Sequence, residues 1–424
     1  MKSKLLSLSL ALMTLTTMSA QTDENGYTTV ELTTGAGYAN RVFFDLSGNT
    51  IVSQDAYNWD VAFKRTSAYN FGTRINDAQD IAVYEASNDP ADWDNIDIAD
   101  IEDWGDPLYN PDLTTDLSEG AFEQGSASYG WGEYSGGGLN GTVIFVLKYP
   151  NDVYYKFYIE SYYGLQNGYT FKYSKWDGTA WEADITKSIA NGTNNHLFNY
   201  YSFDTDDVVA NNEPEIGTWD LMFTRYWTDY PYMGTTIKYR LSGTLQAPGV
   251  TIAKVQPETQ ATADDFTAPT EDDYSAVIST IGHSWKPTSG VYDDMVYYIK
   301  KDNELYRLYF IENGGTANGN MYFKYKAIGE NASTINFENK SSFSIYPNPA
   351  VDKQVTLIYD ITENASNGEV AVYNISGQKV YSSQIANNSG FYQQNLNLSD
   401  LSSGVYIVKV QIGNYSANQK LIIK

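Results

Sequence analysis

One short segment occurs twice in this chain. Residues 59–63, Trp-Asp-Val-Ala-Phe, recur 160 positions later as residues 219–223, Trp-Asp-Leu-Met-Phe. Read as a strand, the first copy places Trp59, Val61 and Phe63 on one face, because successive side chains of a strand point to opposite sides. A large ring on such an apolar stripe anchors a core and is not a catalytic device. The recurrence therefore predicts that one β module is used twice.

The neighbouring segments repeat as well. Phe44, in the strand before the first Trp-Asp pair, matches Tyr201 at an offset of 157 positions. The hairpin of residues 148–173 recurs without gaps 152 positions later, as residues 300–325. The offsets differ by a few residues, which is typical of insertions in surface loops. Whether the two copies form separate sandwiches or one intertwined set of sheets stays open at this level.

Composition and hydropathy give the rest of the domain plan. Lysines near the start, an apolar stretch and a small-residue exit predict a signal peptide that is too short to span ~30 Å of hydrocarbon. A polar Asn- and Ser-rich segment is typical of a linker, and the alternating strands after it predict a small immunoglobulin-like β-sandwich. The predicted all-β chain is a signal peptide (1–20), two related antiparallel β modules (21–186 and 187–328), a linker (329–342) and a C-terminal β-sandwich domain (343–424).

The charge and the rare residue types exclude several functions. A net charge of −25 disfavours nucleic acid and anionic membrane surfaces, because phosphate contacts need Lys and Arg. The absence of Cys excludes disulfides, thiolate nucleophiles and iron–sulfur clusters, and two His are too few for a three-His zinc site. No later segment is long and apolar enough to be a transmembrane helix.

Motifs for catalysis and metal binding are missing. The glycine-rich residues 129–138 lack the Lys-Ser/Thr that a phosphate-binding loop needs. The Asp-rich residues 89–119 are either a solvated loop or a calcium site, although they lack the order of a calcium loop. No nucleophile elbow accompanies either His, and a carboxylate pair for glycoside hydrolysis is defined in space and not in sequence. We predict no enzyme, no catalytic residue and no metal site.

Aromatic residues in loops are the first candidates for binding. Rings outside regular strands stack on sugars, unless they pack under their own loops. The candidates of this kind are Trp227, Tyr230, Tyr162 and Tyr163.

The last 80 or so residues resemble the C-terminal sorting domain of proteins exported by the type IX secretion system of Bacteroidetes. The resemblance rests on residues 346–350 (Tyr-Pro-Asn-Pro-Ala), 372–377, 401–406 and a basic terminus. It implies contact with the type IX secretion machinery, export, and a secreted or cell-surface location after processing. The residues that carry the sorting motif are Tyr346, Pro347, Asn348, Pro349, Gly377 and Gly404.

The repeated region resembles the HmuY-like family of β-rich secreted proteins, some of which bind haem. The resemblance rests on the Trp-Asp strand, the aromatic strand before it and the hairpin of residues 148–173. It implies haem as a cofactor, for which His196 and His283 are the only His that can serve as axial ligands. Each His alone is more often structural. The softer alternatives, Met222, Met233, Met295 and Met321, more often fill gaps in a core.

Together these features predict a secreted or cell-surface ligand-binding protein with haem as its ligand. The alternative is a surface or adhesive protein that binds carbohydrate or protein without haem.

Overall fold

Every regular element longer than six residues in the described part of the chain is a β-strand. The structure is a computed structural model, and it describes residues 14–17, 22–65, 72–135, 138–163, 168–192, 195–260, 266–302, 304–330, 341–346, 348, 350, 353–361, 364–374, 378–413 and 415–424. Within these ranges the one α-helix, α2 (Gly315–Asn318), has four residues, and the other helical turns are 3-10 turns of three to six residues. The predicted all-β fold class is confirmed.

The chain divides into two compact units. The first holds residues 1–301 and 305–329, and the second holds residues 302–304 and 330–424. The predicted linker lies mostly in residues 331–340, outside the described residues.

Four β-sheets make up the first unit. The first sheet has the order β13 (Ile185–Ile189), β12 (Tyr169–Lys175), β11 (Val153–Tyr162), β10 (Ile144–Tyr149) and β7 (Ala82–Ser87), and the hairpin of β8 (Gly132–Ser135) and β9 (Gly138–Gly141) pairs with β11. The second has the order β15 (Asp207–Val209), β14 (Phe198–Ser202), β5 (Val61–Lys64) and β6 (Thr73–Ile75). The third has the order β1 (Thr14–Thr17), β4 (Thr50–Asp55), β3 (Asn40–Asp45), β16 (Leu221–Tyr232) and β17 (Thr235–Gln246). The fourth has the order β18 (Thr251–Val255), β19 (Val296–Lys301), β20 (Glu304–Asn313), β21 (Asn320–Glu330) and β2 (Thr28–Thr33).

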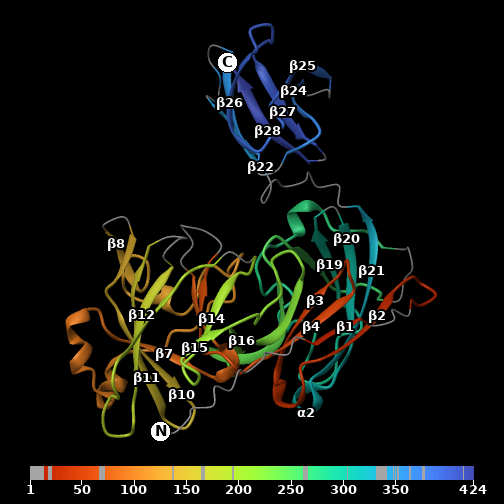
Figure 1. Cartoon of the computed structure of the whole chain (residues 1–424). Helices are drawn as coiled ribbons and strands as arrows, with labels where there is room; N and C mark the ends of the chain where they lie inside the picture. The colour runs from red at the N-terminus through yellow and green to blue at the C-terminus, as the bar shows by residue number, and fades with distance from the viewer. Residues whose placement is uncertain are drawn as a thin grey trace, which may run out of the picture. The chain divides into compact units, whose positions relative to one another are not determined.

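The sheets stack face to face in that order, from the yellow strands to the teal strands of Figure 1. Between the first and second sheets, Phe63 stacks on Phe171 with 4.9 Å between the ring centroids. Between the second and third, the Arg41 guanidinium lies 4.7 Å from the ring centroid of Tyr200. Between the third and fourth, the ring centroids of Phe44 and Phe323 are 5.1 Å apart. The second and third sheets are therefore covered on both faces, which explains why all four residues of β5 are buried.

The sequence repeat is visible as a repeat of strand pairing. Val61 of β5 lies opposite Tyr201 of β14, and Leu221 of β16 lies opposite Phe44 of β3. The partners in these two pairs are related by the offsets of 160 and 157 positions seen in the sequence. The same antiparallel register is thus built twice in the first unit.

The structural halves do not coincide with the sequence copies. β14 and β15 belong to the second predicted module, yet β14 pairs with β5 of the first module and β15 extends the sheet beside β14. β2, β3 and β4 belong to the first predicted module, yet β2 pairs with β21 and β3 with β16 of the second module, and β4 extends the sheet beside β3. The boundary drawn between residues 186 and 187 therefore does not follow the sheets, because the N-terminal strands complete the second half.

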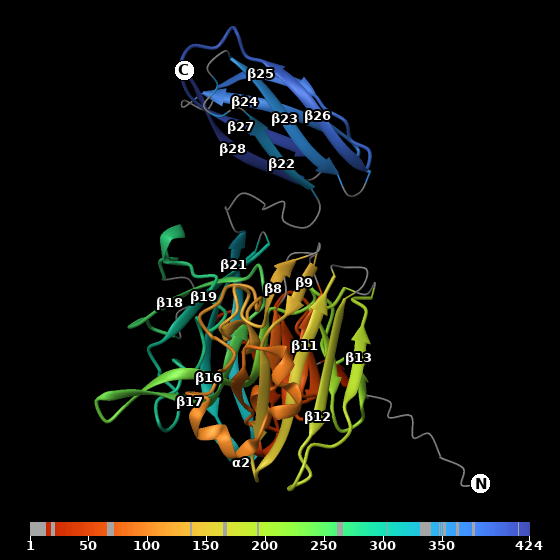
Figure 2. The same cartoon turned by 90° about the vertical axis from the view of Figure 1, so that its left-hand side faces the viewer.

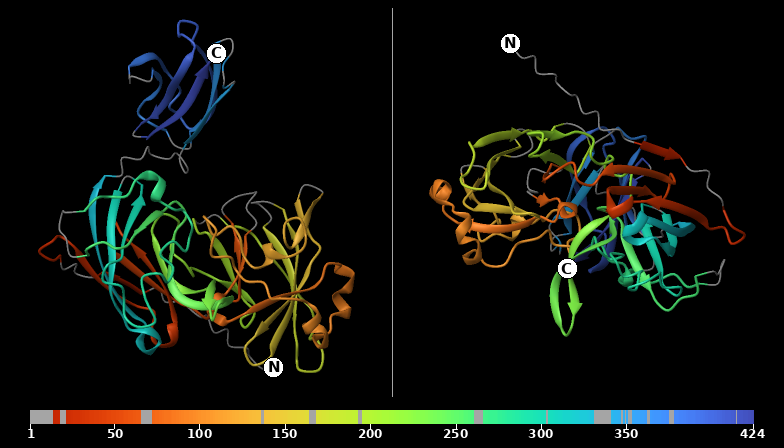
Figure 3. Two further views of the ribbon diagram at one scale, coloured as in Figure 1. Left: turned by 180° about the vertical axis from the view of Figure 1, so that it is seen from behind. Right: turned by 90° about the horizontal axis from the view of Figure 1, so that it is seen from below.

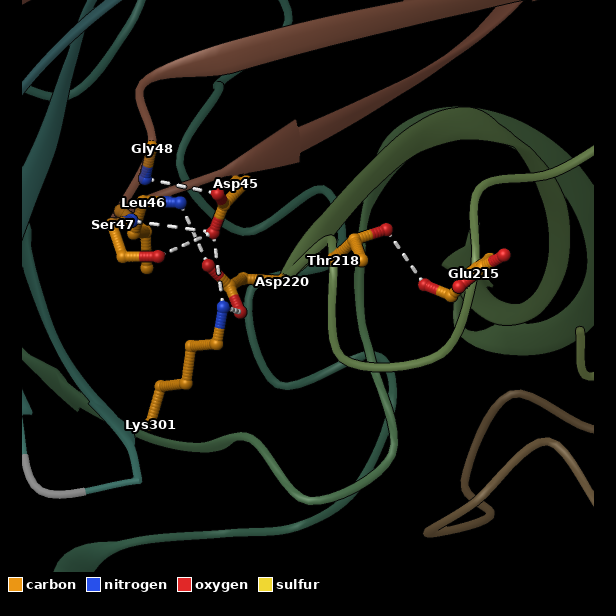
Figure 4. Close-up of polar contacts among 8 residues, drawn as sticks. All are labelled: Asp45, Leu46, Ser47, Gly48, Glu215, Thr218, Asp220 and Lys301. Atoms are coloured by element: carbon orange, nitrogen blue, oxygen red, sulfur yellow. Dashed lines mark hydrogen bonds and ion pairs between the residues drawn. The ribbon is translucent and has the colours of Figure 1, made fainter. Parts of the chain in front are cut away.

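The repeated aspartate joins each Trp-Asp segment to its neighbouring strands. The Asp220 carboxylate accepts a hydrogen bond from the backbone N–H of Leu46 at 2.7 Å and forms an ion pair with Lys301 at 2.8 Å (Figure 4). Lys301 also pairs with Asp45 at 3.0 Å. Burial raises the pKa of Asp220 to about 6, although Lys301 opposes the shift. The buried carboxylate is thus held by one charge and one backbone donor.

The buried carboxylate of Asp60 is stabilised by hydrogen bonds, without a cation. Its carboxylate accepts hydrogen bonds from the backbone N–H of Phe203 at 2.6 Å, from the Tyr149 hydroxyl at 2.8 Å and from the Gln79 amide at 2.9 Å. Tyr149 ends β10 as Lys301 ends β19, 152 positions later, so the two partners occupy equivalent places. Burial raises the pKa of Asp60 as well.

The faces of the first Trp-Asp segment differ from the sequence prediction. Val61 and Phe63 pack in the core between the first and second sheets, whereas Trp59 packs with Ala62 in the core on the other side. The prediction that Trp59, Val61 and Phe63 share one face was wrong. The regular strand begins only at Val61, so the alternation does not extend back to Trp59.

The second unit is a two-sheet β-sandwich. One sheet has the order β22 (Ser341–Tyr346), β23 (Gln354–Ile361) and β26 (Gly390–Asn397). The other has the order β25 (Lys379–Gln384), β24 (Gly368–Asn374), β27 (Gly404–Ile412) and β28 (Tyr415–Ile423). A single apolar cluster that includes Leu357, Val372 and Val408 fills the space between them.

The predicted signal peptide lies almost entirely outside the described residues. Its one described segment, β1 (Thr14–Thr17), pairs with β4 at the edge of the third sheet. Among the described residues, none of the helices is long and apolar enough to cross a membrane.

Candidate functional site

A two-stranded arm extends from the third sheet. β16 and β17 have twelve residues each and pair along their whole length, from Leu221 opposite Gln246 to Tyr232 opposite Thr235. Only the first part of β16 also pairs with β3. The distal part stands clear of the sheets in Figure 2 and in the right-hand view of Figure 3.

One face of the arm carries three tyrosines, which we call the tyrosine face. Residues directly opposite one another in an antiparallel pair share a face, and so do residues two positions apart. Tyr230 and Tyr232 of β16 therefore share a face with Tyr239 of β17, because Thr228 lies opposite Tyr239. The rings of Tyr230 and Tyr239 lie 5.5 Å apart. Tyr232 is 51% exposed and Tyr239 is 48% exposed, so the face is open to a ligand.

Side chains on the opposite face of the arm contact other residues of the protein. Asp229 and Lys238 form an exposed ion pair of 2.8 Å there. Trp227, a predicted sugar-binding residue, lies on this face with its ring 4.2 Å from that of Tyr109. It is therefore separated from Tyr230, the other candidate in the same segment.

The side chain of His283 lies at the base of the tyrosine face. Its Nδ1 is 2.9 Å from the Tyr226 hydroxyl, and its ring is 5.9 Å from that of Tyr230. Burial lowers the pKa of His283, and Lys286 acts in the same direction. The imidazole is therefore neutral at pH 7, with one ring nitrogen already fixed by a hydroxyl. The structure thus brings together two residues that the sequence analysis named for different ligands, His283 and Tyr230.

His196 lies in a different environment. It precedes β14, and its pKa is lowered by burial and by Arg65, against an opposing effect of Glu215. Arg65 and Glu215 are not among the groups that shift the pKa of His283. The structure shows no contact between the two His in its described part, so it does not assemble a paired ligand set.

The four methionines named as alternative haem ligands differ in burial. Met222, Met295 and Met321 are buried in one apolar core, which is the gap-filling use that the sequence favours. Met233 is 87% exposed at the turn of the arm.

Tyr162 and Tyr163 lie near the end of β11 and have opposite environments. Tyr162 is 1% exposed and packs on Tyr169 at 4.5 Å between ring centroids, so its ring is not available to a ligand. Tyr163 is 43% exposed and its hydroxyl donates to the Asn140 side chain at 2.9 Å. Contrary to the sequence prediction, Tyr162 and residues 226–232 belong to regular strands and not to loops.

The Asp-rich segment forms short 3-10 turns. The Asp89 carboxylate caps residues 90–95 by accepting from the Ala91 N–H, and Asp97 caps residues 98–103 by accepting from the Ala99 N–H. The described residues contain no group of three or more His, Cys, Asp or Glu that is arranged to hold a metal ion.

A small cavity lies between the second and third sheets. Its volume is about 50 Å³, and its lining includes Trp59 and Tyr200 on one side and Arg41 and Arg225 on the other. A buried water needs about 10–15 Å³ of such space, so the cavity holds only a few molecules of that size. It is too small for haem or for a sugar ring.

The sorting-motif residues lie in the second unit. Tyr346 ends β22 and Gly404 begins β27, whereas Pro347, Pro349 and Gly377 are outside the described residues. Asn348 binds the last strand twice: its side-chain amide donates to the carbonyl of Lys420 at 2.6 Å and its oxygen accepts from the N–H of Ile422 at 3.0 Å. The motif thus closes the sandwich by joining its first and last strands.

Residues 344–424 match the family model described as the secretion system C-terminal sorting domain. This confirms the predicted sorting domain. The domain belongs to type IX secretion and points to secretion and cell-surface attachment. The matched residues do not include the repeated region, so its HmuY-like resemblance stays a prediction.

The other comparisons give no further guide. None of the curated proteins matches the sequence. One solved structure, a mutant of the C-terminally truncated trimeric ectodomain of the C. elegans fusion protein EFF-1, aligns with 98% of this chain and 97% of its own at 9% identity. Its TM-score is 0.16, so no argument rests on it.

Sequence reasoning missed Tyr232 and Tyr239, the two most exposed rings of the tyrosine face. The signal was available in Met233-Gly234, because a turn with positive φ at both residues, here 49° and 84°, is typical of a two-residue hairpin. That turn fixes the register that places both rings on one face.

Proposed function

We propose that this protein is an exported, cell-surface carbohydrate-binding protein that uses the tyrosine face of its arm. The observation that carries the proposal is the exposure of Tyr232 and Tyr239 on the same face as Tyr230, on an arm that projects from the packed sheets. Large rings kept open to solvent on a projecting element are more than a core requires, since the four sheets are already packed without them.

The chemistry of the face suits a sugar. Tyr presents a planar apolar ring and a hydroxyl, so one side chain offers both a stacking surface and a hydrogen bond with little loss of rotamer freedom. The neutral imidazole of His283 adds a polar group at the base of the arm. Since the chain has a net charge of −25, a neutral polysaccharide suits it better than a polyanion.

The proposed role is binding without catalysis. The tyrosine face carries hydroxyl, apolar and imidazole groups, and the buried Asp112 carboxylate accepts from Thr228 on this face at 2.7 Å. The arm carboxylate of Asp229 lies on the other face in its ion pair with Lys238. Glycoside hydrolysis requires two carboxyl groups that flank one bond.

A glycan array probed with the full chain tests the proposal. We expect signal on neutral glucans, mannans or xylans and a weaker signal on sulfated or uronic-acid polymers. A chain that binds no glycan on the array, or only polyanions, would contradict the proposal.

Haem is the second candidate, and it rests on His283. Tyr226 holds one ring nitrogen of His283, and such a contact is typical of a His whose other nitrogen serves as a ligand. A haemin titration followed by visible absorption tests this: we expect a saturable band that is lost in His283→Ala and kept in His196→Ala. A band that does not depend on His283, or the absence of a band, would contradict the haem hypothesis.

A further inference from the structure

We propose that the cavity between the second and third sheets is a binding site for one small inorganic anion, such as chloride. The inference is independent of the carbohydrate proposal, because the cavity and the tyrosine face share no residue.

The hydrogen-bonding groups at the cavity carry the argument. Among the described residues that line it, three buried side-chain atoms lack a hydrogen-bond partner: Arg41 Nε, Trp59 Nε1 and Arg225 Nε. All three are donors, and no buried side-chain acceptor among the described lining residues is left unpaired. A buried donor without an acceptor costs about 1–3 kcal/mol. A ligand that only accepts hydrogen bonds satisfies all three, whereas water brings two further protons that need acceptors of their own.

The Arg41 guanidinium is fixed in a way that leaves its Nε edge open. Its planar group lies against the rings of Phe43, Trp59 and Tyr200, at 5.1, 5.4 and 4.7 Å. Its terminal nitrogens are occupied, because Nη1 donates to the Tyr200 hydroxyl at 3.2 Å and Nη2 to the carbonyl of Asn212 at 2.6 Å. The Nε–H group is therefore held in place by contacts that do not satisfy it.

The charge around the cavity is positive. Three guanidinium groups line it, those of Arg41, Arg74 and Arg225, against two carboxyl groups, those of Asp77 and Glu213. None of the three arginines forms an ion pair within 4 Å among the residues that the structure describes. Arg41 and Arg74 are 6% and 8% exposed, so solvent screens their charge only weakly.

Protonation increases this excess. Burial raises the pKa of Glu213 and raises the pKa of Asp77 to about 7. The charged groups that face Asp77 are Arg74 and Arg240, which oppose the shift, and Asp112, which adds to it. As the pH falls through 7, Asp77 loses its charge and the positive excess grows. We therefore expect anion binding to tighten on mild acidification.

Thermal unfolding of the full chain tests the site. Chloride and bromide are titrated against gluconate at constant ionic strength. A ligand of the folded state raises the Tm with concentration, and we expect about 2 °C or more for each tenfold increase above the Kd. Two variants each remove an unpaired donor: Trp59→Phe keeps a ring, and Arg225→Gln also removes the positive charge. Both should lose the halide dependence.

Trp131→Phe is the matched control. Trp131 is fully buried and its Nε1 also lacks a partner, but it lies in the core between the first and second sheets and does not line the cavity. This variant should keep the halide dependence. A crystal grown in bromide gives an answer even if a variant fails to fold, and we expect an anomalous peak in the cavity. Only water there, no halide-specific change in Tm, or a change that survives Trp59→Phe would overturn the proposal.

Discussion

At the scale of single residues, two aspartates in identical motifs are stabilised by different partners. Asp60 is held by hydroxyl, amide and backbone donors, while Asp220 is held by Lys301 and one backbone donor. The partners Tyr149 and Lys301 occupy equivalent strand ends, so the repeat has a neutral donor at one of these positions and a cation at the other. Lys301 then has a second carboxylate, Asp45, within 3.0 Å. The second half of the molecule should therefore depend on this lysine.

Removal of Lys301 tests this dependence. Lys301→Met leaves the carboxylates of Asp45 and Asp220 without their cation, and a broken buried pair of this kind costs about 3–5 kcal/mol. Lys324→Met is the control, because its ion pair with Asp23 is partly exposed and is worth at most about 1 kcal/mol. Urea unfolding measures both; equal losses in the two variants would contradict the account.

Asp220 should also leave a signature in the pH dependence of stability. Its folded-state pKa of about 6 lies above its usual value of 3.8, so the folded chain binds more protons than the unfolded chain between these values. Stability therefore falls as the pH rises from about 4 to 6, and the loss is complete above 6. Asp220→Asn keeps an acceptor for the Leu46 N–H and should flatten this part of the curve. A curve with the same slope in the variant would show that other groups produce it.

The sequence predicted which residues form the repeat, but not which side of the strand each side chain points to. Trp59 and Asp60 stand out in sequence because they recur, but burial on both sides of the second sheet removes the polar alternation that reports a strand's orientation. The sequence also placed Tyr162 in a loop, although it is a core residue at the end of β11.

At the scale of elements, the arm is the feature that sequence reasoning misread. Pro231 and three tyrosines within seven residues suggested a loop, yet they continue β16. A proline is tolerated there because the distal part of β16 pairs only with β17 and its other edge is free. The arm therefore adds little to the packed core.

Substitutions on the tyrosine face should accordingly spare the fold. Tyr232→Ala and Tyr239→Ala remove rings that are about half exposed, so each should change the free energy of unfolding by less than about 0.5 kcal/mol. Phe223→Ala, in the buried part of the same strand, should cost about 3–5 kcal/mol. A large loss of stability in the arm variants would show that the rings serve packing.

At the scale of the whole molecule, the N-terminal strands complete the second half. β2 ends the fourth sheet beside β21, with Thr28 opposite Tyr325, and β3 and β4 extend the third sheet beside β16. The end of β21 therefore lies next to the start of β2, where a short loop can join them. The sequence showed the repeat but not this arrangement, because pairing partners far apart in a chain leave no local signal.

A circular permutant tests the arrangement. A chain that starts at residue 56 and carries residues 27–55 after residue 328, joined by a short Gly-containing loop, should fold with the native circular dichroism spectrum. Deletion of residues 22–55 should instead unfold the second half, because it exposes β21 and β16. A stable deletion variant would contradict the described pairing.

The sorting domain was predictable to within a residue, since its motifs are specific. We expect a chain that stops at Asn339 to remain in the periplasm of a host with type IX secretion, while the full chain reaches the cell surface. Fractionation and surface labelling distinguish the two locations, and a truncated chain on the surface would contradict the role of residues 344–424.

The most direct test of the central claim is the affinity of the arm for a glycan. Titration of a neutral polysaccharide with the full chain compares the wild type, the double variant Tyr232→Ala/Tyr239→Ala, and Tyr134→Ala as a control whose ring is 60% exposed on β8, away from the arm. The account predicts at least a tenfold loss of affinity in the double variant and none in the control. Equal affinity in all three chains would place recognition elsewhere and contradict the claim.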